Sequence, residues 1–200
     1  MFGGRLDCKM IVAEKSRLRA ELLEKLRAFS GEERSRQNAI LADKFFALPE
    51  FVAAQTIGFF ASEPFEVATD FLIERSLQLG KKVGLPRVET PPAPLVRGEQ
   101  RNLIFHEIKN LADCTPGCFG INCPVATAPK IPLAEIDLLV VPALAFDASG
   151  NRLGRGGGFF DRVLEKFRGA SVGLAFDFQI LEKIPVEKFD KKVSQILIGK

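Results

Sequence analysis

Apolar side chains recur at helical spacing near the start of the chain. Between residues 12 and 29 they follow one helical face, at Leu18, Leu22, Leu23 and Leu26. The motif Ser30-Gly31-Glu32-Glu33 has the S-x-x-E form of a capping box, which predicts a second helix running toward Leu48. The two segments together predict an N-terminal helical hairpin.

Beyond the hairpin, short apolar runs alternate with helical patterns. Strands are predicted at residues 56–60, 82–85, 136–141, 171–176 and 195–198. Helices are predicted at residues 69–79, 159–167 and 179–183, and a loop is predicted at 147–158. An alternating segment at 102–108 precedes an irregular stretch from 114 to 132. This alternation is typical of an α/β fold whose mainly parallel sheet is covered on both faces.

Length and composition indicate one core. The 200 residues, 46% of them hydrophobic, suit a single domain, which we assign to residues 10–200. Residues 1–9 are expected to form a disordered leader outside it, with either Met1 or Met10 as the native start.

Charge and hydropathy exclude several classes of function. The net charge of +3, from 28 basic and 25 acidic residues, is too small for a phosphate-neutralising face, so no nucleic-acid partner is expected. No apolar stretch has the length of a membrane span, and the first residues lack the apolar run of a secretory signal. We therefore expect a cytoplasmic protein with no membrane partner.

Four cysteines in a chain without a secretory signal indicate reduced thiols. Cys114, Cys118 and Cys123 cluster downstream of His106, and a metal site is the alternative to buried or loop thiols. Their spacing does not form the paired ligands of a structural zinc site, so the role of the cluster stays open.

The segment from Gly150 to Asp161 carries the clearest chemistry. Four glycines between residues 154 and 158 separate a predicted strand from a predicted helix, where backbone N–H groups and the helix dipole can hold an anion. Arg152 and Arg155 can add charge-assisted hydrogen bonds to phosphate. The segment matches neither a Walker A loop nor the dinucleotide fingerprint, and a flexible surface turn is the alternative.

Asp161 stands beside this loop. A carboxylate next to phosphate is repelled unless a cation lies between them, and Mg2+ is the usual cation in that position. A first-turn acid stabilised by the helix dipole is the alternative for the same residue.

Several motifs occur in a characteristic order along the chain. The segments are Asp137–Pro142, Leu144-Ala145-Phe146-Asp147 and Arg152–Asp161, together with Lys15-x-x-x-Arg19, Glu66-Val67-x-Thr69, Leu85-Pro86-Arg87-Val88, Phe119-Gly120-Ile121 and Gly173–Phe176. This set resembles the 5-formyltetrahydrofolate cyclo-ligase family, also called methenyltetrahydrofolate synthetases, over nearly the whole predicted domain.

The resemblance implies a Rossmann-like three-layer α/β/α fold and a monomeric enzyme. It also implies cyclisation of 5-formyltetrahydrofolate to 5,10-methenyltetrahydrofolate, while ATP is converted to ADP and phosphate. In such enzymes the formyl oxygen is phosphorylated and N10 then closes the ring, so no protein nucleophile is expected. A non-catalytic binder of ATP and reduced folate, or the same ATP chemistry on another small heterocycle, are the two other interpretations.

The resemblance also implies roles for individual residues. ATP would be held by Lys15, Arg19, Arg152, Leu153, Gly154, Arg155, Gly156, Gly157, Gly158, Phe159 and Phe160. The folate would be held by Ala61, Glu66, Arg155, Gly156, Gly157, Gly158 and Phe159. Asp161 would hold Mg2+, the cofactor.

From the residues alone, solvated side chains are the alternative for Lys15, Arg19 and Glu66. Arg87 could bind an anion, and His106 is expected to be structural.

Two departures from the family pattern concern the site. Phe159 and Phe160 replace a usual Tyr-Tyr pair, which retains stacking but removes two hydroxyl groups. In the segment from Asp190 to Ser194, the serine stands where the resemblance leads us to expect a second Mg2+ carboxylate.

Overall fold

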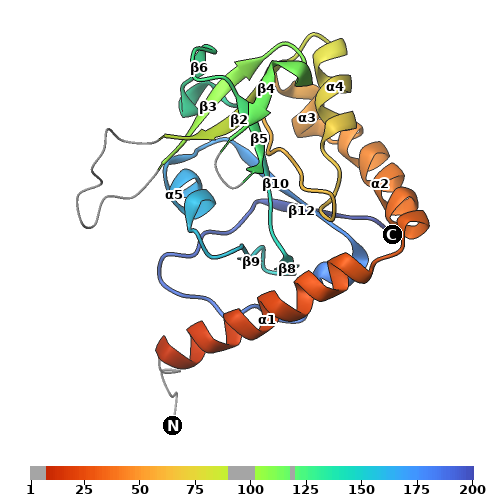
Figure 1. Cartoon of the computed structure of the whole chain (residues 1–200), viewed down its shortest axis with the longest axis vertical. Helices are drawn as coiled ribbons and strands as arrows, with labels where there is room; N and C mark the ends of the chain where they lie inside the picture. Colours follow the sequence, from red (N-terminus) through yellow and green to blue (C-terminus); the bar gives the residue numbers. More distant parts are fainter. Residues whose placement is uncertain (1–7, 90–101, 118–119) are drawn as a thin grey trace.

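The computed structural model describes residues 8–89, 102–117 and 120–200, which form a mixed α/β fold (Figure 1). Within these residues one sheet has seven strands, in the order β12-β10-β7-β1-β2-β3-β6. Their bounds are β1 Thr56–Gly58, β2 Lys82–Val88, β3 Leu103–Ile108, β6 Lys130–Ile131, β7 Leu138–Val141, β10 Ala170–Ala175 and β12 Gln195–Ile198. The strands from β12 to β2 pair in parallel, while β3 and β6 add antiparallel pairs at one edge. The predicted mainly parallel sheet is confirmed.

Helices occupy most of the predicted helical segments. They are α1 Cys8–Ala28, α2 Gly31–Phe46, α3 Pro49–Ala53, α4 Asp70–Gln78 and α5 Phe159–Lys166. Ser30 caps α2 as its motif predicts, since its Oγ accepts a hydrogen bond from the Glu33 backbone N–H at 3.2 Å. Pro49 ends the second helical pattern but also starts α3, because the first turn of a helix tolerates a residue without an N–H.

Residues 8 and 9, which we assigned to the leader, lie in α1. Residues 1–7 lie outside the described part of the chain. No helix in the described residues is long and apolar enough to cross a membrane.

The core lies on both faces of the sheet because side chains alternate along each strand. Leu138 and Val140 of β7 join a cluster that includes residues of α1, α2 and α4. Leu139 and Val141 join a second cluster with Val163 of α5. Figure 1 accordingly shows α2, α3 and α4 to one side of the strands and α5 to the other.

A second sheet replaces part of the loop predicted at 147–158. It has the order β11-β8-β9, with β8 Ala145–Asp147, β9 Arg152–Leu153 and β11 Ile180–Leu181. The buried Asp147 carboxylate stabilises this sheet, because it accepts hydrogen bonds from the backbone N–H groups of Ser149, Asn151 and Ile184. The helix predicted at 179–183 is wrong, because residues 180–181 pair with β8 instead.

The irregular middle of the chain adds short strands. β2 continues past Pro86 to Val88. Its pairing with β1 ends at Gly84, so Pro86 pairs with β3 alone, and a residue without an N–H is tolerated better there than in a strand paired on both sides. A small hairpin of β4 Cys114–Pro116 and β5 Asn122–Pro124 lies nearby.

The side chains considered in this middle region have structural contacts. Arg87 donates to the Pro124 carbonyl at 2.8 Å and to Cys123 Sγ at 3.2 Å, so it holds the β4–β5 hairpin. His106 is buried with Nδ1 2.7 Å from the Ala128 carbonyl, as expected for a structural residue. Cys114 and Cys123 are free thiols, and Cys118 lies outside the described residues.

Candidate functional site

A cavity of about 1030 Å³ opens where three strands end. Its lining includes Ala61 just beyond β1, Val88 at the end of β2 and Pro142 just beyond β7. The chain leaves β1 toward β2 on one side, while β7 pairs with β1 on the other. Ligands of open α/β sheets bind at the carboxyl ends of strands at such a reversal. The fold therefore creates this cavity at its expected place.

The structure brings into this cavity all fourteen residues that the resemblance assigned to ATP, folate or Mg2+. The lining contains Lys15, Arg19, Ala61, Glu66, Arg152, Leu153, Gly154, Arg155, Gly156, Gly157, Gly158, Phe159, Phe160 and Asp161. They come from α1, the segment between β1 and α4, β9, the glycine loop and the start of α5. Segments separated by more than a hundred positions in the sequence thus line the same cavity.

The glycine loop is shaped by backbone conformations that suit glycine. Gly156 has φ 102° and Gly158 has φ 64°, a left-handed region that other residues rarely adopt. Gly158 is the N-cap of α5, so the loop delivers the helix start to the cavity. At the other end, Arg19 Nε donates to the Gly154 carbonyl at 2.8 Å and ties the loop to α1.

Arg152 places a buried cation at this loop. The side chain comes from β9, the residue is 7% exposed, and Nη2 donates to Asp161 Oδ1 at 2.7 Å. Burial lowers the pKa of the Arg152 guanidinium, and the charge of Asp161 opposes that effect. Its buried Nε has no hydrogen-bond partner in the described part of the chain. A buried donor of this kind favours an anionic ligand, because an unmade hydrogen bond is costly.

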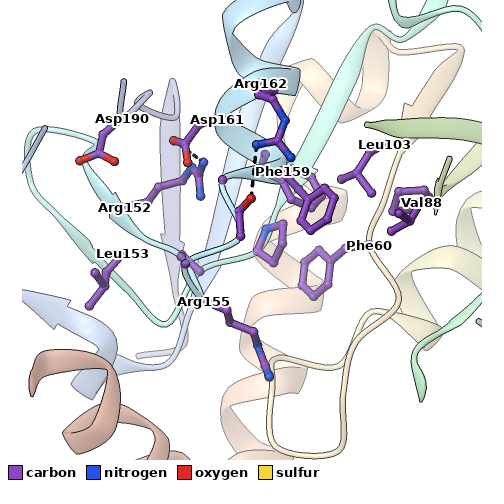
Figure 2. Close-up of a pocket in the computed structure, with 18 of the residues that line it drawn as sticks. Phe60, Val88, Leu103, Arg152, Leu153, Arg155, Phe159, Asp161, Arg162 and Asp190 are labelled. Atoms are coloured by element: carbon purple, nitrogen blue, oxygen red, sulfur yellow. Dashed lines mark hydrogen bonds and ion pairs between the residues drawn. The ribbon is translucent and has the colours of Figure 1, made fainter. Parts of the chain in front are cut away.

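Lys15 forms a second buried cationic centre. It is 4% exposed, and Nζ lies 2.7 Å from Glu187 Oε2 and 2.5 Å from Asp190 Oδ2. Neither acid was among the nominated residues, although Asp190 begins the segment in which we looked for a second metal ligand. Glu187 and Asp190 both line the cavity. The charged end of the cavity is therefore formed by Lys15, Arg152 and the nearby acids, which include Asp161 and Asp190 (Figure 2).

Ser194 is not among the residues that line this cavity. Its Oγ lies 3.1 Å from Ser171 Oγ, at the amino end of β10, whereas the cavity lies at the carboxyl ends of strands. The expectation that Ser194 takes the place of a cavity carboxylate is therefore corrected. Asp190 is the acid of that segment that reaches the site.

The other end of the cavity is apolar with one charged edge. Phe60, Val88, Leu103 and Phe159 form its wall in Figure 2, and Arg155 projects beside them. Arg155 Nη2 lies 2.7 Å from Glu63 Oε2 and 2.9 Å from Glu66 Oε1. Sequence reasoning nominated Glu66 and missed Glu63, which has no motif of its own. Only the turn between β1 and α4 places the two acids together.

The arrangement defines a class of protein: an α/β protein in which one cavity has a cationic glycine loop at one end and an apolar wall at the other. A cationic glycine loop suits a phosphate-type anion, and phenylalanine rings with a carboxylate edge suit a flat apolar ligand.

Comparison with known proteins gives the particular family. Residues 11–199 match the 5-formyltetrahydrofolate cyclo-ligase family. The enzyme of that name from Escherichia coli K12 is 33% identical over 171 residues, covering 84% of this chain and 90% of the relative. The mouse relative is 32% identical over 194 residues and covers 92% of each chain. The chain belongs to the 5-formyltetrahydrofolate cyclo-ligase family.

A solved structure supports the same assignment. The NMR structure of Aquifex aeolicus 5,10-methenyltetrahydrofolate synthetase superimposes with a TM-score of 0.80 at 31% identity. The match covers 93% of this chain and 90% of that one, so the two proteins share nearly the whole fold.

Proposed function

We propose that this protein catalyses the ATP-dependent cyclisation of 5-formyltetrahydrofolate to 5,10-methenyltetrahydrofolate, with release of ADP and phosphate. The observation that carries the proposal is the convergence of all fourteen nominated side chains and loop residues on one cavity. Family membership supports the same activity. The residues of the charged end would bind ATP, and those of the apolar end would bind the reduced folate.

The chemistry needs positioning more than a reactive side chain. The formyl oxygen attacks the terminal phosphorus of ATP, and the bond to the ADP oxygen breaks. N10 of the folate then attacks the formyl carbon and loses its proton to solvent, and the C–O bond breaks as phosphate leaves. Lys15, Arg19 and Arg152 would hold the phosphates and offset charge during both steps.

The remaining residues would hold the folate and keep water away. Glu66 and Arg155 would bind the polar edge of the pterin, while Phe159 and Ala61 would contact its flat faces. The glycine loop from Gly154 to Gly158 would lie between the two ligands and contact both, so it would align the formyl oxygen with the terminal phosphate.

Mg2+ fits the charged end of the cavity. No group of three or more acidic, histidine or cysteine side chains gathers as a metal cage among the described residues. However, Mg2+ is commonly bound by one or two carboxylates together with phosphate oxygens. Asp161 and Asp190 would provide these carboxylates, and the bound ion would neutralise phosphate charge.

We also propose the finer assignments that the family resemblance suggests. The two packed faces of β7 support a Rossmann-like three-layer arrangement, and the Ser30 cap between α1 and α2 supports an N-terminal helical hairpin. The free thiols of Cys114 and Cys123 support a cytoplasmic location. A monomer without a nucleic-acid partner completes the proposal, and light scattering after gel filtration tests its oligomeric state.

A direct assay tests the activity. Purified protein, 5-formyltetrahydrofolate and MgATP should generate the absorbance of methenyltetrahydrofolate, with one ADP formed per product molecule. Folded protein that binds ATP but forms no product would contradict the proposal and favour a non-catalytic binder. The serine at position 194 does not favour that binder, because Asp190 would supply the second carboxylate at the cavity.

A further inference from the structure

The glycine loop is linked to the opposite wall of the cavity by one arginine between two acids. Arg155 Nη2 bonds to Glu63 Oε2 at 2.7 Å and to Glu66 Oε1 at 2.9 Å. Nε adds a bond to the same Glu66 oxygen at 3.2 Å. Partial burial lowers the pKa of Arg155, but the charges of Glu66 and Glu63 outweigh it and hold the pKa above its usual value.

The two acids sit on a tightly bonded turn. The Glu63 N–H donates to Glu66 Oε2 at 2.9 Å, and the Glu66 N–H donates to the Glu63 carbonyl at 3.0 Å. The base of the turn is closed by reciprocal bonds between Ser62 and Thr69, and Thr69 Oγ1 also donates to the Phe60 carbonyl. The carboxylates therefore present a preorganised edge to Arg155.

This geometry puts the arginine in competition with the proposed substrate. One oxygen of Glu66 is occupied by the Glu63 N–H, and the other is occupied by Arg155. The aminopyrimidine edge of a reduced pterin carries N–H donors, as a guanidinium does. Glu66 Oε1 accepts from both Nε and Nη2 of Arg155, which uses both of its lone pairs, so a pterin that bonds to this oxygen replaces Arg155 there.

We propose that Glu63 is a positioning residue for folate binding: it retains Arg155 at the cavity wall when the pterin takes Glu66. The inference rests on the proposed function. The exchange requires an inner acid that binds the pterin and an outer acid that keeps the arginine. The two carboxylates differ in this sense, since the Glu66 side chain is 14% exposed and the Glu63 side chain is 32% exposed. Glu63 thus lies toward solvent and keeps its bond to Nη2 while the inner acid changes partner.

The consequence is selective for one substrate. Without Glu63, the Arg155 side chain would have no acid partner once the pterin binds Glu66, so the side chain and the glycine loop would be less ordered. Ordering them on binding would reduce the affinity for folate. The charged end of the cavity, which is the proposed ATP end, is held by other contacts: the Arg19 bond to Gly154 and the Arg152 pair with Asp161. Binding of ATP should therefore be insensitive to Glu63.

The test compares Glu63→Gln with wild type in the cyclisation assay. We expect the KM for 5-formyltetrahydrofolate to rise about fivefold, while kcat and the KM for ATP stay within about twofold. Glu63→Asp, which keeps the charge, should remain within about twofold of wild type in all three constants. Glu21→Gln is the matched control, because it removes an ion pair with Arg17 on the exposed face of α1 outside the cavity lining.

A double-mutant cycle with Arg155→Gln shows whether Glu63 acts through the arginine. In that background, Glu63→Gln should change the folate KM by less than about twofold. An unchanged folate KM in the single variant, equal rises in both KM values, or an undiminished effect in the Arg155→Gln background would overturn the inference. An inactive wild type overturns the proposed function and this inference together, whereas an active wild type without the selective effect overturns the inference alone.

Discussion

The two ends of the cavity hold their charges in different ways. At the charged end, where we propose that ATP binds, Lys15 and Arg152 are nearly buried, and each is paired with an acid. At the apolar end, where we propose that folate binds, the Arg155 side chain is 43% exposed and shared by two acids. Breaking a buried pair leaves an uncompensated charge, whereas exposed pairs contribute little energy and exchange readily. The ATP end is therefore suited to stabilising charge, and the folate end to exchanging partners.

The largest expected effect of a single substitution lies at the ATP end. Asp161→Asn removes the carboxylate that pairs with Arg152 and that we assign to Mg2+. Turnover should fall at least about a hundredfold through lost charge stabilisation, while the folate KM changes little. Steady-state kinetics at saturating ATP measure this effect, and unchanged turnover would remove the assigned metal role.

Lys15→Gln should give the next largest effect. The substitution removes a buried cation and leaves Glu187 and Asp190 facing the ATP phosphates without it. The value of kcat/KM for ATP should fall about thirtyfold, equivalent to about 2 kcal/mol, since charge-assisted bonds contribute about 1.5–3 kcal/mol each. Lys15→Arg serves as the charge-conserving control, and equal losses for ATP and folate would argue against a separate ATP end.

Asp147→Asn tests the β8–β9 turn, which places Arg152 at the proposed ATP end of the cavity. Burial opposes ionisation of this carboxyl, but hydrogen bonds from Asn151 and from the Ile184, Asn151 and Ser149 backbones outweigh it and lower the pKa of Asp147. A lowered folded-state pKa contributes stability above the unfolded value of about 3.9, and that stability is lost as pH falls through the folded value. We expect the substitution to cost about 2 kcal/mol of unfolding free energy at pH 7.

The pH dependence provides the specific readout for Asp147. Urea unfolding of wild type should show stability falling as the pH drops below about 4, and the variant should show a shallower fall. Parallel curves for the two proteins would mean that the ionised carboxylate does not hold the β8–β9 turn. Asp43→Asn, an exposed acid on α2, is a suitable comparison.

Of these substitutions at the cavity and its support, Arg155→Gln should give the smallest effect, and the effect should be confined to folate binding. Among the described residues, the Arg155 side chain forms ion pairs with Glu63 and Glu66, and the pterin can take the Glu66 oxygen that the substitution releases. The folate KM should rise about tenfold or less, while the ATP KM stays within about twofold. Isothermal titration with each ligand measures the difference, and a larger loss of ATP affinity would place Arg155 at the ATP end instead.

The order of the motifs predicted which residues line the cavity. Local sequence patterns were less successful for the short strands beside it, β9 and β11. The residues on α1, the glycine loop and α5 were nominated from the sequence and lie together. In contrast, residues 152–153 were predicted as loop and form β9, because pairing with β8 is a contact between segments that no local period reveals. The same holds for β11, where tertiary pairing replaced a predicted helix.

The sequence by itself determined the alternation of strands and helices, the Ser30 cap and the glycine loop, because periodicity, capping and positive φ are properties of neighbouring residues. Only the tertiary structure decided which acids meet which cations. Asp190 reaches Lys15 across 175 positions, Ser194 turns to Ser171 instead, and Glu63 joins Arg155 from another loop. Electrostatic contacts depend on distance in space, and the folded backbone sets that distance.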